Sequence, residues 1–246
     1  MLSSITIFVT YVLLSLPAAA IGLPWTVLRN DISFLYRWAR WIVDVGLKLG
    51  RIHVEVSGRE HIPVARACIF MSNHVSNLDP PVLFSLLPFR TAFFLKRSLL
   101  KIPLLGYGMR LADFIPVDRN GRVDSARESV SYAKRVLESG VHVFTFPEGT
   151  RSRTGKLLDF KKGPFFLARE SGAPVIPVSI SGTESMMSKG SLLINPGTAR
   201  VAFHEGIDPT QFATREALMA VVRAAITSGL PPQADGLNKK PASVTT

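Results

Sequence analysis

The chain has 246 residues, 47% of them apolar, and a net charge of +11 from 29 Lys and Arg against 18 Asp and Glu. This length suits one domain with an appendage and is short for two full domains. The positive charge indicates an anionic partner, but a mean hydropathy of +0.24 and a sequence without nucleic-acid-binding motifs favour a phosphate or a lipid surface over nucleic acid.

The first 28 residues contain no charged side chain. At about 1.5 Å per helical residue, this stretch could cross the roughly 30 Å of a bilayer's hydrocarbon core. It lacks the basic leading region of a secretory signal, which favours a retained membrane segment over a cleaved leader. Pro17 and Pro24 would bend or end a helix, so a spanning path and a re-entrant path are both open.

An amphipathic helix is predicted after Asn30 and Asp31, which can cap it. Its apolar residues recur with helical spacing, and they are Phe34, Leu35, Trp38, Trp41, Ile42, Val45 and Leu49. The opposite face carries Ser33, Arg37, Arg40, Asp44 and Lys48. A tryptophan-lined apolar face with a mostly basic opposite face is typical of an interfacial helix, and the alternative is an ordinary helix packed on the core. We therefore assign residues 1–50 to a membrane-associated two-helix module.

From residue 51 onward, short β-rich runs alternate with helical patterns. Strands are predicted at 52–56, 68–71, 91–95, 114–117, 141–146, 175–180 and 199–203, and helices at 80–87, 125–138, 164–171 and 214–228. This alternation predicts an α/β fold with a helix-flanked, mostly parallel sheet, whose site lies beyond the carboxyl ends of the strands. Residues 51–230 form this predicted domain, and 231–246 form a disordered tail.

A histidine and a carboxylate lie close together in the polar run that follows the second predicted strand. His74 precedes Asp79 by five positions, among turn-forming serines and asparagines. A histidine can take a proton near neutral pH, and a carboxylate on its other ring nitrogen fixes the tautomer and stabilises the imidazolium. We predict that His74 and Asp79 activate a hydroxyl group.

A turn that can bind an anion follows the fifth predicted strand, at residues 146–152. Gly149 suits a tight turn, Thr150 with its neighbouring amides can bind oxygen anions, and Arg151 can hold a phosphate in a bidentate fork. The charge of Glu148 would repel phosphate, so a hydrogen bond to a glycerol moiety, or to an arginine, is the better hypothesis.

Other candidate residues lie elsewhere in the chain. Arg119 is a second candidate phosphate ligand, and Lys96 adds positive charge at the end of a strand. Cys68 is interpreted as a buried thiol, and a single cysteine excludes an internal disulfide. The remaining histidines have no such polar setting and are assigned to surface or packing. We expect no metal, because no third ligand follows a recognisable spacing.

Four blocks of this sequence, at residues 74–79, 114–119, 146–152 and 175–178, resemble those of the glycerolipid acyltransferase family. The resemblance covers roughly residues 68–205 and is greatest to the 1-acylglycerol-3-phosphate (lysophosphatidate) acyltransferases. One departure is plain: the family's second block usually opens with glycine, where this chain has Asp113. Lys96 resembles a lysine that some members of the family use.

The resemblance implies acyl transfer from acyl-CoA or acyl carrier protein to the sn-2 hydroxyl of 1-acylglycerol 3-phosphate, which makes phosphatidate without a cofactor. Alternatives are another lysophospholipid acceptor and a catalytically silent lipid-binding membrane protein. The serine-hydrolase signature Gly-x-Ser-x-Gly is absent, which counts against a serine esterase. Basic residues follow the apolar segment, so the site is expected at the cytoplasmic face of the cell membrane.

Overall fold

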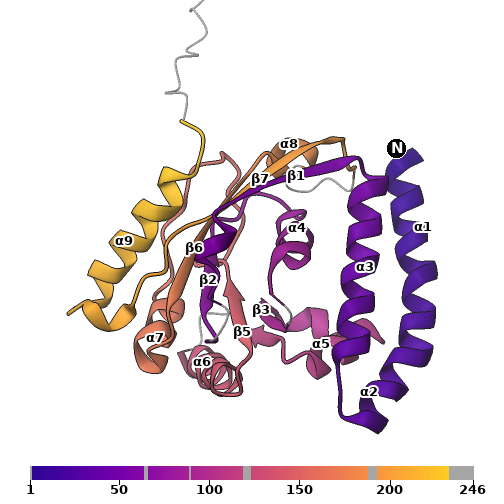
Figure 1. Ribbon diagram of the computed structural model, residues 1–246, viewed down its shortest axis with the longest axis horizontal. Coiled ribbons are helices and arrows are strands. Elements are labelled where there is room, and N and C mark those ends of the chain that lie inside the picture. Colours follow the sequence, from indigo (N-terminus) through magenta and orange to yellow (C-terminus); the bar gives the residue numbers. More distant parts are fainter. Residues whose placement is uncertain (1, 64–65, 89, 119–122, 188–192, 233–246) are drawn as a thin grey trace, which may run out of the picture.

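The computed structural model describes residues 2–63, 66–88, 90–118, 123–187 and 193–232. Within them lies a seven-stranded sheet in the order β1-β7-β6-β2-β5-β3-β4 (Figure 1). Neighbouring strands are parallel except β6 and β7, which are antiparallel. The strands are β1 (Ile52–Ser57), β2 (Ile69–Ser72), β3 (Thr91–Lys96), β4 (Ile115–Val117), β5 (His142–Thr145), β6 (Val175–Ser181) and β7 (Gly197–Phe203). The predicted mostly parallel α/β fold is confirmed.

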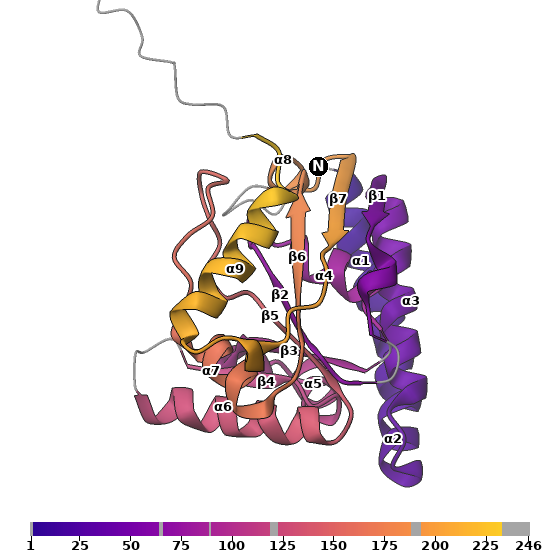
Figure 2. The same ribbon diagram turned by 60° about the vertical axis from the view of Figure 1, so that its left-hand side comes forward.

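Helices cover both faces of the sheet, and each face has its own apolar core (Figures 1 and 2). One core joins the sheet to α4 (Asp79–Leu86) and to the end of α3 (Ser33–Leu49). The other joins it to α6 (Val123–Glu138), α7 (Lys162–Ser171) and α9 (Arg215–Ser228). The central strands β2 and β5 are buried throughout, as expected for strands covered on both faces.

The predicted helices are all present, with small differences at their ends. α6 begins at Val123, before the predicted start at Ser125, so Ser125 lies inside its first turn. Two further helices, α5 (Leu105–Leu111) and α8 (Thr183–Met186), were not predicted. Short single turns occur at η2 (Arg59–His61), η3 (Arg97–Lys101) and η4 (Pro209–Gln211).

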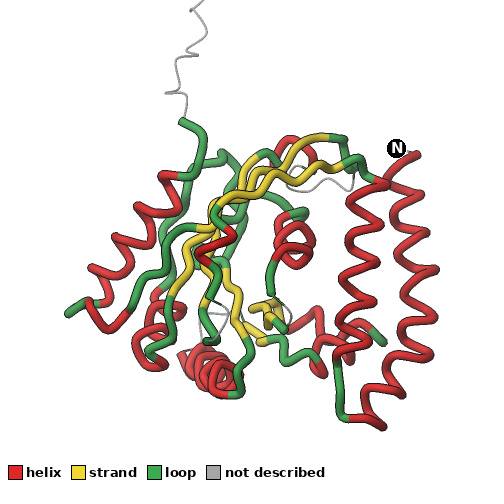
Figure 3. Tube along the Cα trace, viewed as in Figure 1, coloured by secondary structure: helices red, strands yellow, loops and turns green. Residues whose placement is uncertain are grey.

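The N-terminal segment is helical along almost its whole length (Figure 3). α1 (Leu2–Pro17) continues through a π-helical segment, η1 (Ala18–Gly22), into α2 (Leu23–Arg29), so Pro17 and Pro24 do not interrupt the helical path. By length and composition, the helical run Val9–Arg29 could cross a membrane. Asn30 ends it in a left-handed conformation, and Asp31 accepts a hydrogen bond from the Ser33 amide at 2.8 Å.

α3 packs more extensively against the rest of the protein than its amphipathic pattern indicates. Tyr36, Ile42 and Leu47 are buried, and the Trp38 indole donates to the Leu14 carbonyl at 3.3 Å. Arg40, expected on the polar face, donates to the backbone carbonyl of Ser85 in α4 and to that of Leu87 just after α4. α3 therefore contributes to the domain's core through Leu47, while Trp41 and Leu49 stay exposed.

The conformation of the backbone explains how Asp113 can stand where the family's second block usually has glycine. Asp113 adopts a left-handed conformation with φ +60°, the region that glycine enters without steric cost and that aspartate tolerates better than most residues. Its carboxylate forms an ion pair with Arg90 at 2.9 Å. The chain thus keeps the turn that a glycine would make and adds an ion pair at the same place.

Candidate active site

The histidine and the aspartate meet at the carboxyl end of the sheet. His74 follows β2, and Asp79 is the first residue of α4, so the short connection between them brings their side chains together. His74 Nδ1 lies 2.8 Å from Asp79 Oδ2. Because an ionised carboxylate only accepts hydrogen bonds, Nδ1 carries the proton and the lone pair of Nε2 is the basic position.

Asp79 is fully buried, and four donors surround its carboxylate. Besides His74, the amides of Val75 and Ser76 donate to Oδ2 at 2.7 and 2.8 Å. The hydroxyl of Thr183, the first residue of α8, donates to Oδ1. Hydrogen bonds from several donors hold this buried carboxylate in one orientation. Thr183 lies outside all four blocks, and no sequence pattern indicates its contact with Asp79.

The backbone around His74 is fixed from two further elements. Asn73 pairs in both directions with the backbone of Ile180 in β6, at 2.8 and 2.9 Å. The Ser76 hydroxyl donates to the Met187 carbonyl at 2.7 Å, directly after α8. The run that reads as a polar loop is therefore largely buried and hydrogen-bonded, which makes the position of His74 rigid.

The turn at residues 146–152 packs directly against the histidine. The ring of Phe146 stacks on the His74 imidazole with centroids 3.9 Å apart and planes 14° apart. Gly149 has φ +68°, as a tight turn requires, and the Ser152 amide donates to the His74 carbonyl at 2.8 Å. The structure thus brings together two of the sequence blocks that carry the predicted chemistry.

Glu148 connects this turn to the histidine through the backbone. Its carboxylate, 1% exposed, accepts hydrogen bonds from the His74 amide at 2.7 Å and the Leu158 amide at 2.8 Å. Burial raises the pKa of Glu148, against the lowering effect of these amides and of Arg223. Glu148 therefore positions His74, a task that sequence reasoning missed. A contact of Glu148 with a glycerol moiety stays a prediction.

The other predicted binding residues differ in how far they join this site. Gly149 and Thr150 are exposed and Arg151 is half-buried, all in the turn beside His74. Lys96 is exposed at the carboxyl end of β3, on the same edge of the sheet. Arg119 lies outside the described residues.

An apolar cavity of about 310 Å³ adjoins the histidine loop. One wall comes from Asn77, Leu78 and Pro81, within seven positions of His74 in the sequence, and another from α1 and α3. The full lining is Ile7, Tyr11, Val43, Gly46, Leu47, Ile52, Asn77, Leu78, Pro81, Met187 and Ile194. The N-terminal module thus completes a cavity of the catalytic domain, which suits a hydrocarbon chain.

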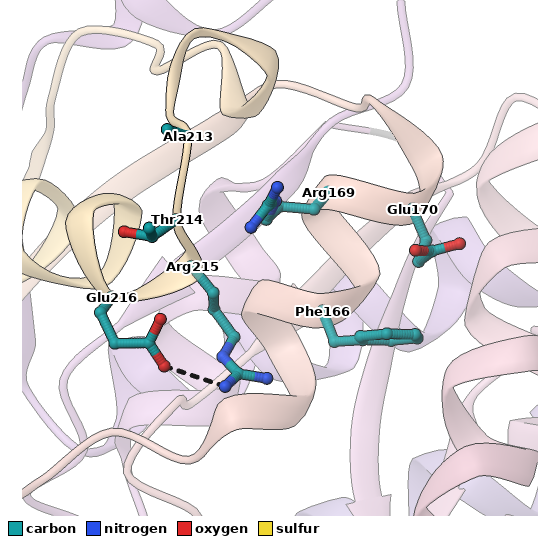
Figure 4. Close-up of a pocket in the computed structure, with 7 residues that line it drawn as sticks. All are labelled: Phe166, Arg169, Glu170, Ala213, Thr214, Arg215 and Glu216. Atoms are coloured by element: carbon teal, nitrogen blue, oxygen red, sulfur yellow. Dashed lines mark hydrogen bonds and ion pairs between the residues drawn. The ribbon is translucent and has the colours of Figure 1, made fainter.

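A second cavity, of about 520 Å³, lies between α7 and α9 (Figure 4). It is lined by Phe166, Arg169, Glu170, Ala213, Thr214, Arg215 and Glu216, none of which belongs to the four blocks. Arg215 and Glu216 form an ion pair at 2.9 Å. Its two arginines and two glutamates balance in charge, so this cavity is poorly suited to a phosphate.

Cys68, His142 and His204 have structural partners. Cys68 is buried with its sulfur 3.2 Å from His142 Nδ1, and burial raises the pKa of the thiol and lowers the pKa of His142. His204 Nε2 lies 2.7 Å from the Ser179 hydroxyl, and burial lowers the pKa of His204 as well. Within the described ranges, no three His, Cys, Asp or Glu side chains are grouped as metal ligands.

This geometry, a His/Asp pair beside the turn at residues 146–152 and an apolar cavity, agrees with comparisons to known proteins. The sequence model of the acyltransferase family matches residues 53–181, more than half of the chain. The chain belongs to this acyltransferase family.

Individual relatives show which acyltransferases the chain is similar to. The chain is 34% identical over 203 residues to a 1-acyl-sn-glycerol-3-phosphate acyltransferase of Limnanthes douglasii, covering 80% of this chain and 70% of the relative. It is 33% identical over 190 residues to the alpha enzyme of that name from Mus musculus, covering 73% and 67%. The crystal structure of the 1-acyl-sn-glycerophosphate acyltransferase PlsC from Thermotoga maritima superposes with a TM-score of 0.71 at 29% identity, over 91% of this chain and 95% of that one.

Proposed function

We propose that this chain transfers an acyl group from a thioester to the sn-2 hydroxyl of 1-acylglycerol 3-phosphate and so makes phosphatidate. The observation that carries the proposal is the histidine whose Nδ1 is held by the buried Asp79 at 2.8 Å, so that Nε2 can act as the base. The names of the relatives at 31–37% identity support the same acceptor.

In the proposed reaction, His74 Nε2 takes the proton of the acceptor hydroxyl as the oxygen attacks the thioester carbonyl. Asp79 stabilises the imidazolium that forms. Collapse of the tetrahedral intermediate breaks the carbon–sulfur bond, and the departing thiolate receives the proton from His74. This direct transfer needs no acyl-enzyme and no metal ion.

The two ends of the acceptor are matched by different parts of the site. The exposed turn at Gly149 and Thr150, with Arg151 beside it, supplies the donors that a phosphomonoester needs. Arg119 is proposed as a second phosphate ligand, and Lys96 as a further positive charge. The apolar cavity beside Leu78 would receive an acyl chain.

Donor and location are also part of the proposal. Acyl-CoA and acylated carrier protein are both soluble thioesters, and either fits the mechanism. The apolar helices of residues 1–50 would hold the protein on a membrane with the site on the cytoplasmic side, because Arg29, Arg37, Arg40 and Lys48 follow the apolar run.

A panel assay tests this function. The purified full-length protein, in detergent, would be offered acyl-CoA or acylated carrier protein together with lysophosphatidate or with lysolipids whose phosphate carries choline, ethanolamine or glycerol. We expect lysophosphatidate to give the highest kcat/KM. Preference for a phosphodiester lysolipid would replace the proposed acceptor, and activity with none of them would favour the silent lipid-binding alternative.

A further inference from the structure

An exposed apolar surface lies on the catalytic domain itself, outside the N-terminal module. It is formed by η3, α5 and the residues between them, and we call it the η3–α5 surface: Leu99, Ile102, Leu104, Leu105 and Tyr107. Leu104 is 53% exposed and Leu105 is 51% exposed, although both are large apolar side chains. A cluster of exposed apolar side chains on one short segment is typical of a protein–protein or membrane interaction site.

The charged residues within the segment that forms the η3–α5 surface are all basic. No acidic residue occurs from Lys96 to Ala112, and Lys96, Lys101 and Arg110 are exposed. Arg97 is the exception among the cations, because Asp118 and Glu128 form ion pairs with it. Apolar side chains flanked by lysine and arginine match an anionic lipid interface, where the chains enter the acyl region and the cations meet the phosphates.

The η3–α5 surface also adjoins the N-terminal helices. A methyl group placed on Gly108 of α5 would contact Leu35 of α3 and Leu23 of α2 at 3.8 and 3.9 Å. α5 lies beside these helices in the ribbon view (Figure 1). Nearby on α2, Trp25, Val27 and Leu28 are exposed as well. The two sets of exposed apolar residues thus belong to neighbouring elements.

The backbone at Leu104 adds a further observation. Leu104 has φ +61° and ψ −56°, a conformation that is costly for a leucine, and yet about half of its surface stays exposed. Contact with lipid would bury the side chains that this conformation displays and so offset its cost.

We propose that the η3–α5 surface is a second membrane contact, which seats the catalytic domain on an anionic bilayer. Because this segment begins where β3 ends, at the edge of the sheet that carries His74, the contact would hold the site close to lipid-borne acceptor. This inference rests on the proposed function, in which the acceptor is a membrane lipid. A second copy of the chain and an acidic carrier protein are the competing occupants.

Spin labels on the full-length protein test the contact. Leu105→Cys and the matched control Val221→Cys, an exposed apolar position on α9, would be labelled with a nitroxide and placed in vesicles of phosphatidylcholine and phosphatidylglycerol. The wild-type chain measures background, because its only thiol, Cys68, is buried. We expect the label at residue 105 to be relaxed by oxygen and shielded from a water-soluble nickel complex, and the label at 221 to show the reverse.

Equal access of nickel to both labels would overturn the proposal. So would a label at residue 105 that is shielded from both reagents, which indicates self-association, or one that only an added carrier protein shields. None of these readouts requires turnover, so they test the membrane contact separately from the proposed reaction.

A kinetic measurement uses the double variant Leu104→Gln/Leu105→Gln. We expect the apparent KM for bilayer-borne acceptor to rise roughly fivefold or more, with unchanged kinetics on a dispersed short-chain acceptor. Equal KM values for wild type and variant on vesicles would contradict the membrane contact. Loss of activity on both acceptors would instead indicate a folding defect, and the spin-label comparison then decides.

Discussion

The hydroxyl of Thr183 provides a test of how the site is held together, because it reaches Asp79 from a helix that no sequence block includes. Thr183→Val removes the hydroxyl but keeps the shape of the side chain. Thr183 and Asp79 are both fully buried, so water cannot readily replace the lost donor. A hydrogen bond to a charged acceptor is worth about 1.5 to 3 kcal/mol, which corresponds to about 10- to 150-fold in an equilibrium or a rate.

The remaining contacts set where in this range the effect should fall. Oδ2 of Asp79 keeps its three donors, from His74, Val75 and Ser76, so the carboxylate stays in place and mainly Oδ1 loses its partner. We therefore expect the lower end of the range: kcat falls about tenfold, with KM for both substrates nearly unchanged.

The assay compares Thr183→Val with Thr183→Ser, which retains a hydroxyl, in steady-state kinetics with a thermal-unfolding measurement on each protein. The serine variant should recover most of the lost turnover. A folded valine variant with wild-type kcat would refute the reasoning, and so would a serine variant as impaired as the valine variant, because the effect would then come from packing alone.

Three further predictions concern Glu148, Arg151 and the apolar cavity. Because burial raises the pKa of Glu148 above its ordinary 4.5, this group's contribution to stability is greatest below that value and declines as the pH rises through the folded-state pKa; thermal unfolding from pH 4 to 7 should show a decline that Glu148→Gln lacks. Arg151→Ala should raise KM for lysophosphatidate by about 10-fold or more and leave KM for the donor nearly unchanged, and equal effects in a two-substrate kinetic analysis would show that the arginine is misassigned. Val43→Phe fills part of the cavity, so across a series of acyl donors its kcat/KM should fall more for long chains than for short ones, with Val43→Ile as the milder control.

Much of the fold follows from local patterns that the sequence displays. The runs that became β2 and β5 are mostly apolar, apart from Ser72, His142 and Thr145, because both faces of these strands are buried. α9 begins directly after Thr214, whose side chain accepts from the Ala217 amide. α5 was missed because its residues contain two glycines and an exposed apolar run, which do not follow the pattern of a helix packed on a core.

The site was predictable where its residues lie close together in the chain. His74 and Asp79 are five positions apart, so their pairing could be inferred from spacing alone. Thr183 is 104 positions from Asp79, and Glu148 is 74 positions from His74, so their contacts depend on how β5 and β6 flank β2. The sequence suggested that Glu148 bonds to a glycerol moiety or to an arginine, and this stays a prediction. The contacts of its buried carboxylate with the His74 and Leu158 amides are revealed only by the packing.

The central claim is that His74 is the base for acyl transfer, and its most direct test is the turnover of His74→Ala. The full-length variant would be assayed for phosphatidate formation from lysophosphatidate and a labelled acyl donor, after thermal unfolding has verified that it is folded. A positioned general base supplies about 10² to 10⁴ in rate, so we expect kcat to fall by at least the lower figure. A folded His74→Ala protein that forms phosphatidate at nearly the wild-type rate would contradict the mechanism.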